Sequence, residues 1–507
     1  MMTKTCSLLI LLTLTTLTFS QTSVPAWHWT LPYLDQLKTA GYLEQIDWTN
    51  RPLQREEIAE TLAAILLNDL PPQYRKIVQI LKKEFPRIQK AIAETPGVRA
   101  EADFRARQSA PDFVNHGAFE IYPQLRWQAA PRTTFYAALK VFNRAPDGYI
   151  GKEFRDLFAY IEQGYLNYRG RYLNFTLGRD FLQTGAGRSG QLLLSDAFRP
   201  MDHYRLRVGG QHIAFSFMGA QLDRRYSPDA GAWANRFMNG HRLHINLKNR
   251  YYLNFSEMVI YGGPQESWNL AFMNPFGFYY GVTTNGPATA ANFLYSIDWD
   301  FYLPYRLNFY GELLIDDLQV DKKTPGDLEP DEIGLLLGLN WHPEKLDPAL
   351  RVNLEYAQVR NRTYNAPQHD WERWVHRNKP LGYWLGNDFK RWQLQVEKLW
   401  RQELRTRIAI ARTLKGEGDV FGEFNTDYLN YTVEEGYDEP FPWGIVQKEW
   451  QWGGEISWPF KKWLVLQASC AWHAYNNYRH QTGKKHDGFS FSAGLFFRGP
   501  FLPLPLL

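Results

Sequence analysis

The chain has 507 residues, with 57 lysines and arginines against 53 aspartates and glutamates, and its small formal charge of +4 excludes a nucleic-acid binder that works through bulk positive charge. Hydrophobic residues make up 44% of the chain, which excludes a largely disordered protein. The mean hydropathy is −0.45, and beyond residue 20 no apolar run approaches the roughly 20 residues of a membrane-spanning helix, which excludes a helical membrane protein. A β-barrel membrane protein is not excluded, because only alternate residues of its strands face lipid.

The first 20 residues predict a cleaved secretory signal peptide. Lys4 gives a positive start, residues 8–19 form an apolar stretch of the usual length, and Thr18 and Ser20 are small residues before a cut ahead of Gln21. Cleavage would leave a single cysteine, so we expect neither an internal disulfide nor a cysteine metal site. The sequence therefore predicts an exported protein.

Residues 21–100 predict a small helical module. Apolar residues recur at helical spacing in three segments, which Gly41 and the prolines Pro71 and Pro72 separate. Three short helices are too few for a large independent domain. We therefore expect the module to dock on the rest of the chain, either as a plug or on its periplasmic side.

From about residue 115 to the end, the hydrophobic period changes to two. Leu307, Phe309 and Leu313 alternate with Asn308 and Glu312, and the same alternation recurs over residues 119–127, 242–248, 351–359, 391–400 and 488–497. A strand with polar residues along one face needs water on that face. The apolar faces approach the 9–11 residues with which a strand crosses a bilayer.

Aromatic residues and connection lengths favour a barrel in the outer membrane over a soluble sandwich. Aromatics such as Tyr251, Tyr252, Tyr302 and Trp392 lie near the predicted strand ends, as an interfacial girdle requires, and short turns alternate with long polar loops. We predict an all-β transmembrane fold, an antiparallel outer-membrane β-barrel of about 18 strands over residues 101–507, with polar residues lining the lumen. Its expected partners are outer-membrane lipid and the barrel insertion machinery but not nucleic acid, and we expect a monomer.

Residues 178–206, "GRDFLQTGAGRSGQLLLSDAFRPMDHYRL", resemble the signature stretch of the Wzi-type capsule assembly family of outer-membrane proteins. The likeness continues through residues 239–247, 256–263, 273–280 and 310–319. Residues 184–187 depart from the family's usual Trp-Gly-Pro-Gly, which bears on the contacts of this loop. The resemblance implies an outer-membrane barrel that a helical module partly closes and that binds capsular or extracellular polysaccharide as a lectin, without chemistry.

Two groups of residues are candidates for polysaccharide binding. The first is charged and surrounds the glycine-rich loop: Arg179, Asp180, Arg188, Asp196 and Asp202. Arginine's planar fork suits an acidic sugar, but the sequence favours the alternative that these residues pair with one another.

The second group comprises the tryptophans Trp371, Trp374 and Trp384 of a long loop. Sugar rings present apolar faces that stack on indole. The alternative is a loop core that packs over the barrel mouth.

Gly185, Gly187 and Gly190 spell GxGxxG, but no strand–helix–strand context surrounds them. We expect these glycines to let the backbone fold tightly inside the barrel or at its rim, and we expect no nucleotide, cofactor or metal.

Two other functions remain as alternatives. One is a diffusion porin for small solutes, and the other is a barrel hydrolase that would use Ser195, Asp196 and His203. Ser195 and Asp196 are neighbours and would point to opposite faces of a strand, so we expect no catalytic residue among them.

Overall fold

The computed structural model describes residues 22–86, 97–111, 116–130, 132–144, 152–228, 230–285, 290–319, 328–400, 403–461, 464–498 and 502–504. The predicted signal peptide, residues 1–20, lies outside these ranges. None of the helices in the described ranges is long and apolar enough to cross a membrane.

Three helices form the N-terminal part, α1 (Leu31–Thr39), α2 (Arg55–Ala64) and α3 (Pro72–Glu84). In α3, Tyr74, Ile77, Val78 and Leu81 are buried at the spacing of one helical face. The positive φ of +84° at Gly41 ends the first helical segment, as the sequence predicts. The helices share one apolar core, which also takes in residues at strand ends of the large sheet: Ala349, Leu399, Val465 and Phe496.

A 20-stranded sheet makes up most of the remaining chain. Its long strands are β2 (Gly97–Pro111), β3 (His116–Ala130), β4 (Thr133–Phe142), β5 (Phe158–Arg169), β6 (Leu173–Asp180), β8 (Met201–Gly209), β9 (Ile213–Gln221), β11 (Ala232–Leu247), β12 (Tyr251–Gly263), β13 (Ala291–Leu303), β14 (Leu307–Asp317), β15 (Glu332–Trp341), β16 (Leu350–Val359), β19 (Phe389–Leu399), β20 (Arg405–Lys415), β21 (Gln447–Lys461), β22 (Leu464–Asn476) and β23 (Lys485–Arg498). Residues 97–100, which the sequence analysis places in the helical module, lie in β2.

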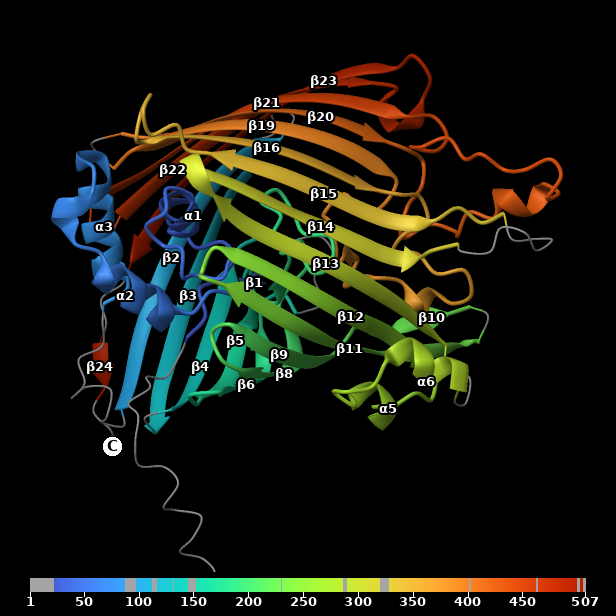
Figure 1. Ribbon diagram of the computed structural model, residues 1–507, viewed down its shortest axis with the longest axis horizontal. Helices are drawn as coiled ribbons and strands as arrows, with labels where there is room; N and C mark the ends of the chain where they lie inside the picture. The colour runs from blue at the N-terminus through green and yellow to red at the C-terminus, as the bar shows by residue number, and fades with distance from the viewer. Residues whose placement is uncertain are drawn as a thin grey trace, which may run out of the picture.

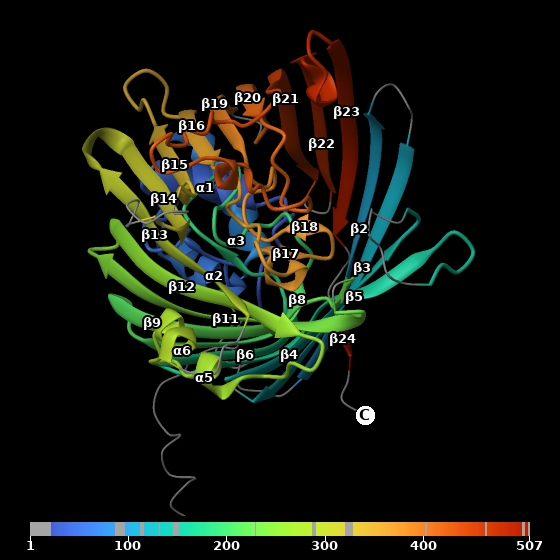
Figure 2. The same ribbon diagram turned by 90° about the vertical axis from the view of Figure 1, so that its right-hand side faces the viewer.

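Every long strand pairs antiparallel with its neighbours along the chain. β2 pairs with β3 and also with β23, so the hydrogen bonding continues from the last long strand to the first. The two other strands of the sheet, β10 (Arg225–Ser227) and β24 (Leu502–Leu504), are three-residue additions beside β11 and β2. The remaining eighteen strands form the predicted antiparallel β-barrel, seen from its long-loop end in Figure 2.

Short elements occupy the ends, the interior and part of the outer face of the barrel. They are the strands β1 (Asn50–Arg51), β7 (Gln183–Thr184), β17 (Val375–His376) and β18 (Lys379–Pro380), the helices α5 (Leu270–Met273) and α6 (Tyr279–Asn285), and the 3₁₀ turns Leu67–Asp69, Pro304–Arg306, Asp370–Glu372, Asp427–Asn430 and Tyr478–His480. The helices α1–α3 lie at the end with the short turns, and the long loops lie at the other end (Figure 1).

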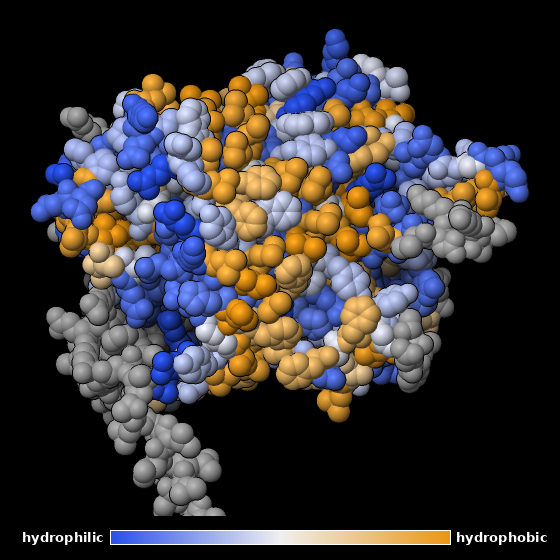
Figure 3. Space-filling view, in the orientation of Figure 1, coloured by the Kyte–Doolittle hydropathy of each residue, from blue (hydrophilic) through white to orange (hydrophobic). Residues whose placement is uncertain are grey.

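The wall alternates as the sequence predicts. On β14, Asn308 and Glu312 are fully buried in the interior, whereas Phe309 keeps 36% of its surface exposed on the outside. Apolar side chains spread across the middle of the outer wall, with hydrophilic regions toward both ends (Figure 3). This distribution is the one that a lipid-facing wall requires.

Two residues of the predicted aromatic girdle face inward instead. Tyr252 and Tyr302 are buried, and the ammonium of Lys38 lies 4.8 and 4.5 Å from the centres of their rings. Alternation along the strand turns Tyr251 outward and Tyr252 inward. Burial lowers the pKa of Lys38 to about 8, against the attraction of Asp300 and Asp47.

Candidate functional site

The segment between β6 and β8, residues 181–200, folds into the barrel. The carboxylate of Glu312 accepts hydrogen bonds from the N–H groups of Gly187 and Leu192, each at 2.6 Å. Glu355 accepts from the N–H of Arg188 at 2.8 Å. The polar residues of the inner wall therefore bind the backbone of this segment, which we call the inward loop.

Glycine is required where the inward loop meets these carboxylates. Gly185 has a φ of +130°, and a Cβ there would lie 2.5 Å from Glu312 Oε1. A Cβ on Gly187 would lie 1.9 Å from the carbonyl oxygen of Gly190. The GxGxxG sequence thus serves close backbone approach inside the barrel, as the sequence analysis expects.

The connection between β16 and β19, residues 360–388, also folds inward and packs on the inward loop. The indole N–H of Trp374 donates to the carbonyl of Leu193 at 2.8 Å. Both segments and the inner wall build one buried apolar cluster, whose members include Leu192, Leu193, Leu194, Met238, Leu314, Tyr364, Trp374 and Tyr383. The interior behind β11–β16 is therefore a packed core.

A chain of alternating charges connects helix α1 to the inward loop and the wall. We call it the charge ladder, and its members are Arg188, Asp35, Arg351, Glu397, Arg405, Glu455 and Arg407. Arg188 lies 3.2 Å from Asp35, which also pairs with Arg351, and Arg351 lies 3.0 Å from Glu397. Arg405 then bridges Glu397 and Glu455 at 2.8 and 2.7 Å, and Arg407 reaches Glu455 at 2.5 Å.

Burial tends to raise the pKa of Asp35, but the guanidinium groups of Arg351 and Arg188 hold that pKa below its ordinary value. Arg188 also lies 3.5 Å from Asp300, and these carboxylates hold its pKa above the ordinary value despite burial. The centre of the ladder is thus ionised and paired, so it holds the module, the inward loop and the wall together.

The opposite side of the interior encloses a cavity of about 580 Å³ between the inward loop and β19–β23. Its lining combines an indole, guanidinium groups, amides and hydroxyls: Trp384, Arg188, Arg391, Arg407, Gln393, Gln395, Gln451, Ser189, Ser469, Ser490 and Ser492. Several alanines and glycines complete the lining and leave the space open. We call this space the Trp384 cavity.

Trp384 keeps 45% of its surface exposed in this cavity. Its indole N–H donates to the carbonyl of Ser189 at 3.1 Å, and the guanidinium of Arg391 lies 5.4 Å from the ring centre. Arg391 is itself held by Gln451 at 3.0 Å. A fixed aromatic surface beside amides, hydroxyls and a guanidinium can stack on a sugar ring and bind its hydroxyl or carboxylate groups.

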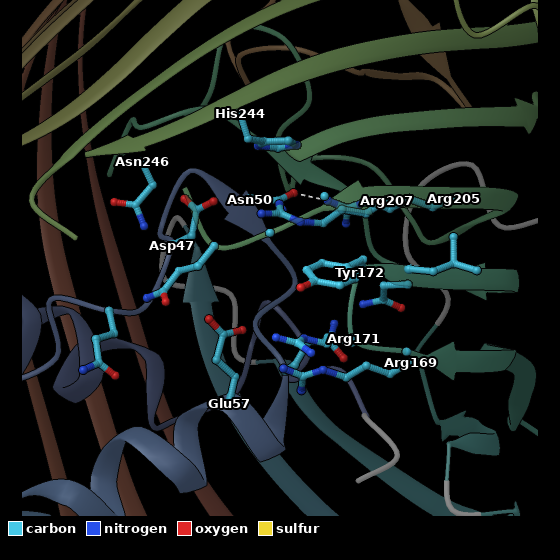
Figure 4. Close-up of a pocket in the computed structure, with 18 of the residues that line it drawn as sticks. Asp47, Asn50, Glu57, Arg169, Arg171, Tyr172, Arg205, Arg207, His244 and Asn246 are labelled. Carbon is cyan, nitrogen blue, oxygen red and sulfur yellow. Dashed lines mark hydrogen bonds between the residues drawn. The ribbon is translucent and has the colours of Figure 1, made fainter. Parts of the chain in front are cut away.

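A second pocket, of about 510 Å³, lies between the helical module and the short-turn end of β5–β12. Figure 4 shows Arg169, Arg171, Arg205 and Arg207 of the wall approaching the module, which contributes residues such as Asp47, Asn50 and Glu57. Arg205 donates to the side-chain oxygen of Asn50. The module's own carboxylates thus counter the basic side of the pocket.

The structure disperses the charged candidates. Arg179 and Asp202 pair with each other at 2.5 Å on the outward face, where Asp202 is well exposed. Asp180 is buried on the inward face and accepts from Ser23 and Gln163 at 3.0 and 2.7 Å.

The remaining charged candidates lie in the inward loop. Arg188 belongs to the charge ladder and also lines the Trp384 cavity, whereas Asp196 is exposed. Arg188 alone of the charged candidates reaches this cavity.

The three tryptophans also separate. Trp374 is fully buried, and Trp371 is 6% exposed, with its ring stacked on His369 at 4.0 Å between centres. Only Trp384 of the three faces open space in the Trp384 cavity. Arg391, Gln393 and Gln395 of the cavity belong to the polar stripe of residues 391–395, which alternation assigns to the lumen but does not single out as a site.

The hydrolase residues do not form a triad in the described part of the chain. Ser195 donates to the carbonyl of Gly382, and His203 Nδ1 lies 3.0 Å from the carbonyl oxygen of Met201. Among the described residues, no group of three or more histidines, cysteines or carboxylates has the arrangement of a metal site.

A sequence profile of the family described as capsule assembly protein Wzi matches residues 97–488. No curated protein sequence matches the chain.

Several solved structures resemble it. Escherichia coli Wzi, described as an outer membrane protein involved in group 1 capsule assembly and a carbohydrate-binding β-barrel, has a TM-score of 0.61 at 15% identity, over 96% of this chain and 100% of that one. Pseudomonas aeruginosa OprD has a TM-score of 0.47 at 12% identity, over 81% of this chain and 96% of that one. OpdK, from the same organism, has a TM-score of 0.46 at 9% identity, over 79% and 98%.

Proposed function

Because the chain belongs to the capsule assembly protein Wzi family, we propose that it binds capsular or other surface polysaccharide and helps to assemble or retain it at the cell surface. The protein acts as a lectin and carries out no chemical step. The observation that carries this proposal is the Trp384 cavity, in which an exposed indole lies beside the guanidinium of Arg391 and the amide of Gln451.

The proposed location is the outer membrane, reached after export with a signal peptide over residues 1–20. The apolar outer wall fits contact with outer-membrane lipid, and the barrel insertion machinery would place a monomer there. The long loops face the outside, and the module of helices α1–α3 faces the periplasm, because outer-membrane barrels have short turns on the periplasmic side.

A polysaccharide offers the same sugar unit many times. One cavity that holds one or two units weakly is enough, because a polymer that contacts several barrels gains avidity through effective concentration. The function therefore requires neither a deep pocket nor a high affinity for a single sugar.

The diffusion porin is the weaker alternative. A porin needs an open lumen, whereas the inward loop and residues 360–388 fill the interior behind β11–β16. Ion conductance in planar bilayers distinguishes the two functions, since a porin conducts steadily and the proposed lectin conducts little.

The test is binding of purified capsular polysaccharide to the detergent-solubilised full chain, measured by surface plasmon resonance at a low protein density that limits avidity. We expect Trp384→Ala to weaken binding about tenfold or more, the loss typical of a central aromatic contact. The matched control is Trp452→Ala, because Trp452 is 42% exposed, nearly as much as Trp384, but lies on the outer wall. Equal affinities of the two variants would remove the lectin site from this cavity.

A further inference from the structure

Three cations surround Leu414 on β19, β20 and β21, close to the long loops. Leu414 pairs in register with Lys390 of β19 on one side and with Lys448 of β21 on the other. Arg412 precedes Leu414 by two residues on β20, so its side chain points to the same face of the sheet. The three strands follow one another around the rim of the barrel in Figure 2. We call Lys390, Arg412 and Lys448 the cation triangle.

The exposure of neighbouring side chains shows that the cation triangle faces out of the barrel. On the same faces of the three strands, Trp392, Ile410 and Trp450 are 41%, 39% and 42% exposed. Arg391 and Gln451 point to the opposite face and line the Trp384 cavity. The cation triangle therefore lies on the outer wall and is separate from the proposed lectin site.

The two ends of β19 differ in how an outward lysine is neutralised. At the short-turn end, the ammonium of Lys398 pairs with Asp347 at 2.7 Å. At the long-loop end, the ammonium of Lys390 donates to the carbonyl of Phe441 at 3.0 Å. In the part of the chain that the structure describes, no member of the cation triangle belongs to an ion pair. Three positive charges thus lie together without a carboxylate to balance them, and such a group attracts anions.

Aromatic side chains adjoin the cation triangle on the side toward the middle of the wall. The guanidinium of Arg412 lies 4.9 Å from the ring centre of Trp450, which stacks on Trp452 with 6.0 Å between centres. Trp392 pairs in register with Arg412 from the other side. A ligand here would meet cations at one end and apolar surface at the other, which are the contacts of an anionic lipid headgroup and its chains.

The outward residues of β19 locate the cation triangle at one edge of the lipid-facing band. Between Lys390 and Lys398 they are Trp392, Leu394 and Val396, all apolar. Over these eight residues, a rise of about 3.3 Å per residue and a tilt near 40° separate the two lysines by roughly 20 Å along the barrel axis. The apolar band of such a barrel is about 25 Å tall, so Lys390 lies near its boundary on the long-loop side.

The spacing of the cations suits phosphate groups. Adjacent strands are about 4.8 Å apart, so about 10 Å separates the backbones of Lys390 and Lys448, with Arg412 between them. Long lysine side chains bind phosphate as point charges, and the guanidinium of arginine binds it through two parallel hydrogen bonds. The three side chains can converge on one phosphate or hold two phosphates of one headgroup.

We propose that the cation triangle binds the phosphate groups of a phosphorylated lipid of the outer leaflet, whose chains lie on Trp392 and Trp450. The proposal rests on the outer-membrane location proposed above, but not on the lectin site. An acidic polysaccharide would also meet the three cations. The cation triangle borders the lipid-facing band, however, where a polar polymer cannot follow, so the lipid is the ligand that uses both parts of this surface.

The test is native mass spectrometry of the purified full chain in detergent, titrated with a disaccharide lipid that carries two phosphates and with the same lipid without phosphate. Each cation beside an anionic lipid contributes about fivefold to the binding constant. We therefore expect the parent chain to prefer the phosphorylated lipid by about 100-fold, and the variant Lys390→Gln/Arg412→Gln/Lys448→Gln to bind both lipids alike.

Single variants give a matched comparison. Lys448→Gln should weaken binding of the phosphorylated lipid about fivefold, whereas Lys398→Gln, the same change at the paired lysine, should leave it unchanged. Heat-modifiable migration shows that each variant is folded, and unchanged binding of capsular polysaccharide separates this surface from the lectin function. Equal binding of the two lipids by the parent chain, equal losses in Lys448→Gln and Lys398→Gln, or a triple variant that loses polysaccharide but not lipid, would overturn the proposal.

Discussion

The two sides of the barrel interior differ in how they are filled. Behind β11–β16, which we call the filled half, the inward loop and residues 360–388 form a dry apolar core on the wall. Behind β19–β23, the open half, polar side chains, alanines and glycines line the Trp384 cavity and leave it open. A barrel of this width is therefore stabilised by protein on one side, and the other side is free to hold a ligand.

The charge ladder crosses the boundary between the halves, so its disruption should have the largest effect. Arg351→Met removes the partner that Asp35 and Glu397 share. We expect a loss of about 3–5 kcal/mol in the free energy of unfolding, because buried carboxylates lose a compensating charge. Urea unfolding in detergent, followed by tryptophan fluorescence, measures this loss.

The control for Arg351→Met is Arg250→Met. Arg250 pairs with Glu44 at 3.1 Å, but half of its side chain is exposed. An exposed pair contributes only about 0–1 kcal/mol. If both variants lose the same stability, the ladder does not hold the two halves together.

The filled half should be sensitive to a single methyl group at the inward loop. Gly187→Ala places a Cβ 2.8 Å from Leu336 and closer still to the backbone of Gly190, so the loop must shift. We expect a loss of about 2–3 kcal/mol and faster proteolysis within residues 181–200. Gly210→Ala is the matched control, because a Cβ there meets nothing within 4 Å, and an equal loss in that variant would contradict the close packing.

Acid should stabilise the filled half through Glu372, which lies in the buried connection outside the strands. Burial raises its pKa to about 7 from 4.5. The folded chain then holds a proton that the unfolded chain releases, so this contribution to stability is complete below pH 4.5 and is lost as the pH rises through 7. We expect Glu372→Gln to be about 1–2 kcal/mol more stable than the parent at pH 8 and to show no such gain at pH 4.5.

Parallel unfolding curves at the two pH values measure this difference. Glu434→Gln is the control, because it makes the same substitution at an exposed side chain and should bring no gain in stability at pH 8. A gain for Glu372→Gln that is the same at both pH values would contradict a protonation effect.

The open half should tolerate the loss of a side-chain hydroxyl from its lining. Ser469 is half-buried on β22 and lines the cavity. We expect Ser469→Ala to change the unfolding free energy by less than about 0.5 kcal/mol, because water can replace its contacts. A loss above about 2 kcal/mol in the unfolding free energy would show that the open half is packed like the filled half and would contradict the difference between them.

The barrel is predictable from the sequence because lipid outside and polar contacts inside impose a period of two on every strand. The assignment of Tyr252 to the outer girdle is wrong, because the same period turns Tyr251 outward and Tyr252 inward, where it covers Lys38. The period identifies the facing direction of a residue but not its partner. Arg188 therefore looks like a ligand-binding group in the sequence, although Asp35 and Asp300 lie beside it in the structure.

The inward loop could be foreseen only in part. Its glycines indicate a close backbone approach, but the carboxylates that bind the loop backbone come from Glu312 and Glu355, far along the chain. Trp371, Trp374 and Trp384 are equivalent in the sequence, and only tertiary packing decides that the first two are buried and the third is exposed.

The pairing of β1 with β7 has a mechanical consequence. Asn50 and Arg51 of the N-terminal part pair, strand to strand, with Thr184 and Gln183 of the inward loop. A polymer dragged by flowing liquid would exert a force on the outer side of the inward loop. Because of this pairing, the helices α1–α3 and the barrel wall share that force. Such a joint spreads tension through the whole depth of the protein, so an anchor built in this way resists being unravelled from its outer edge.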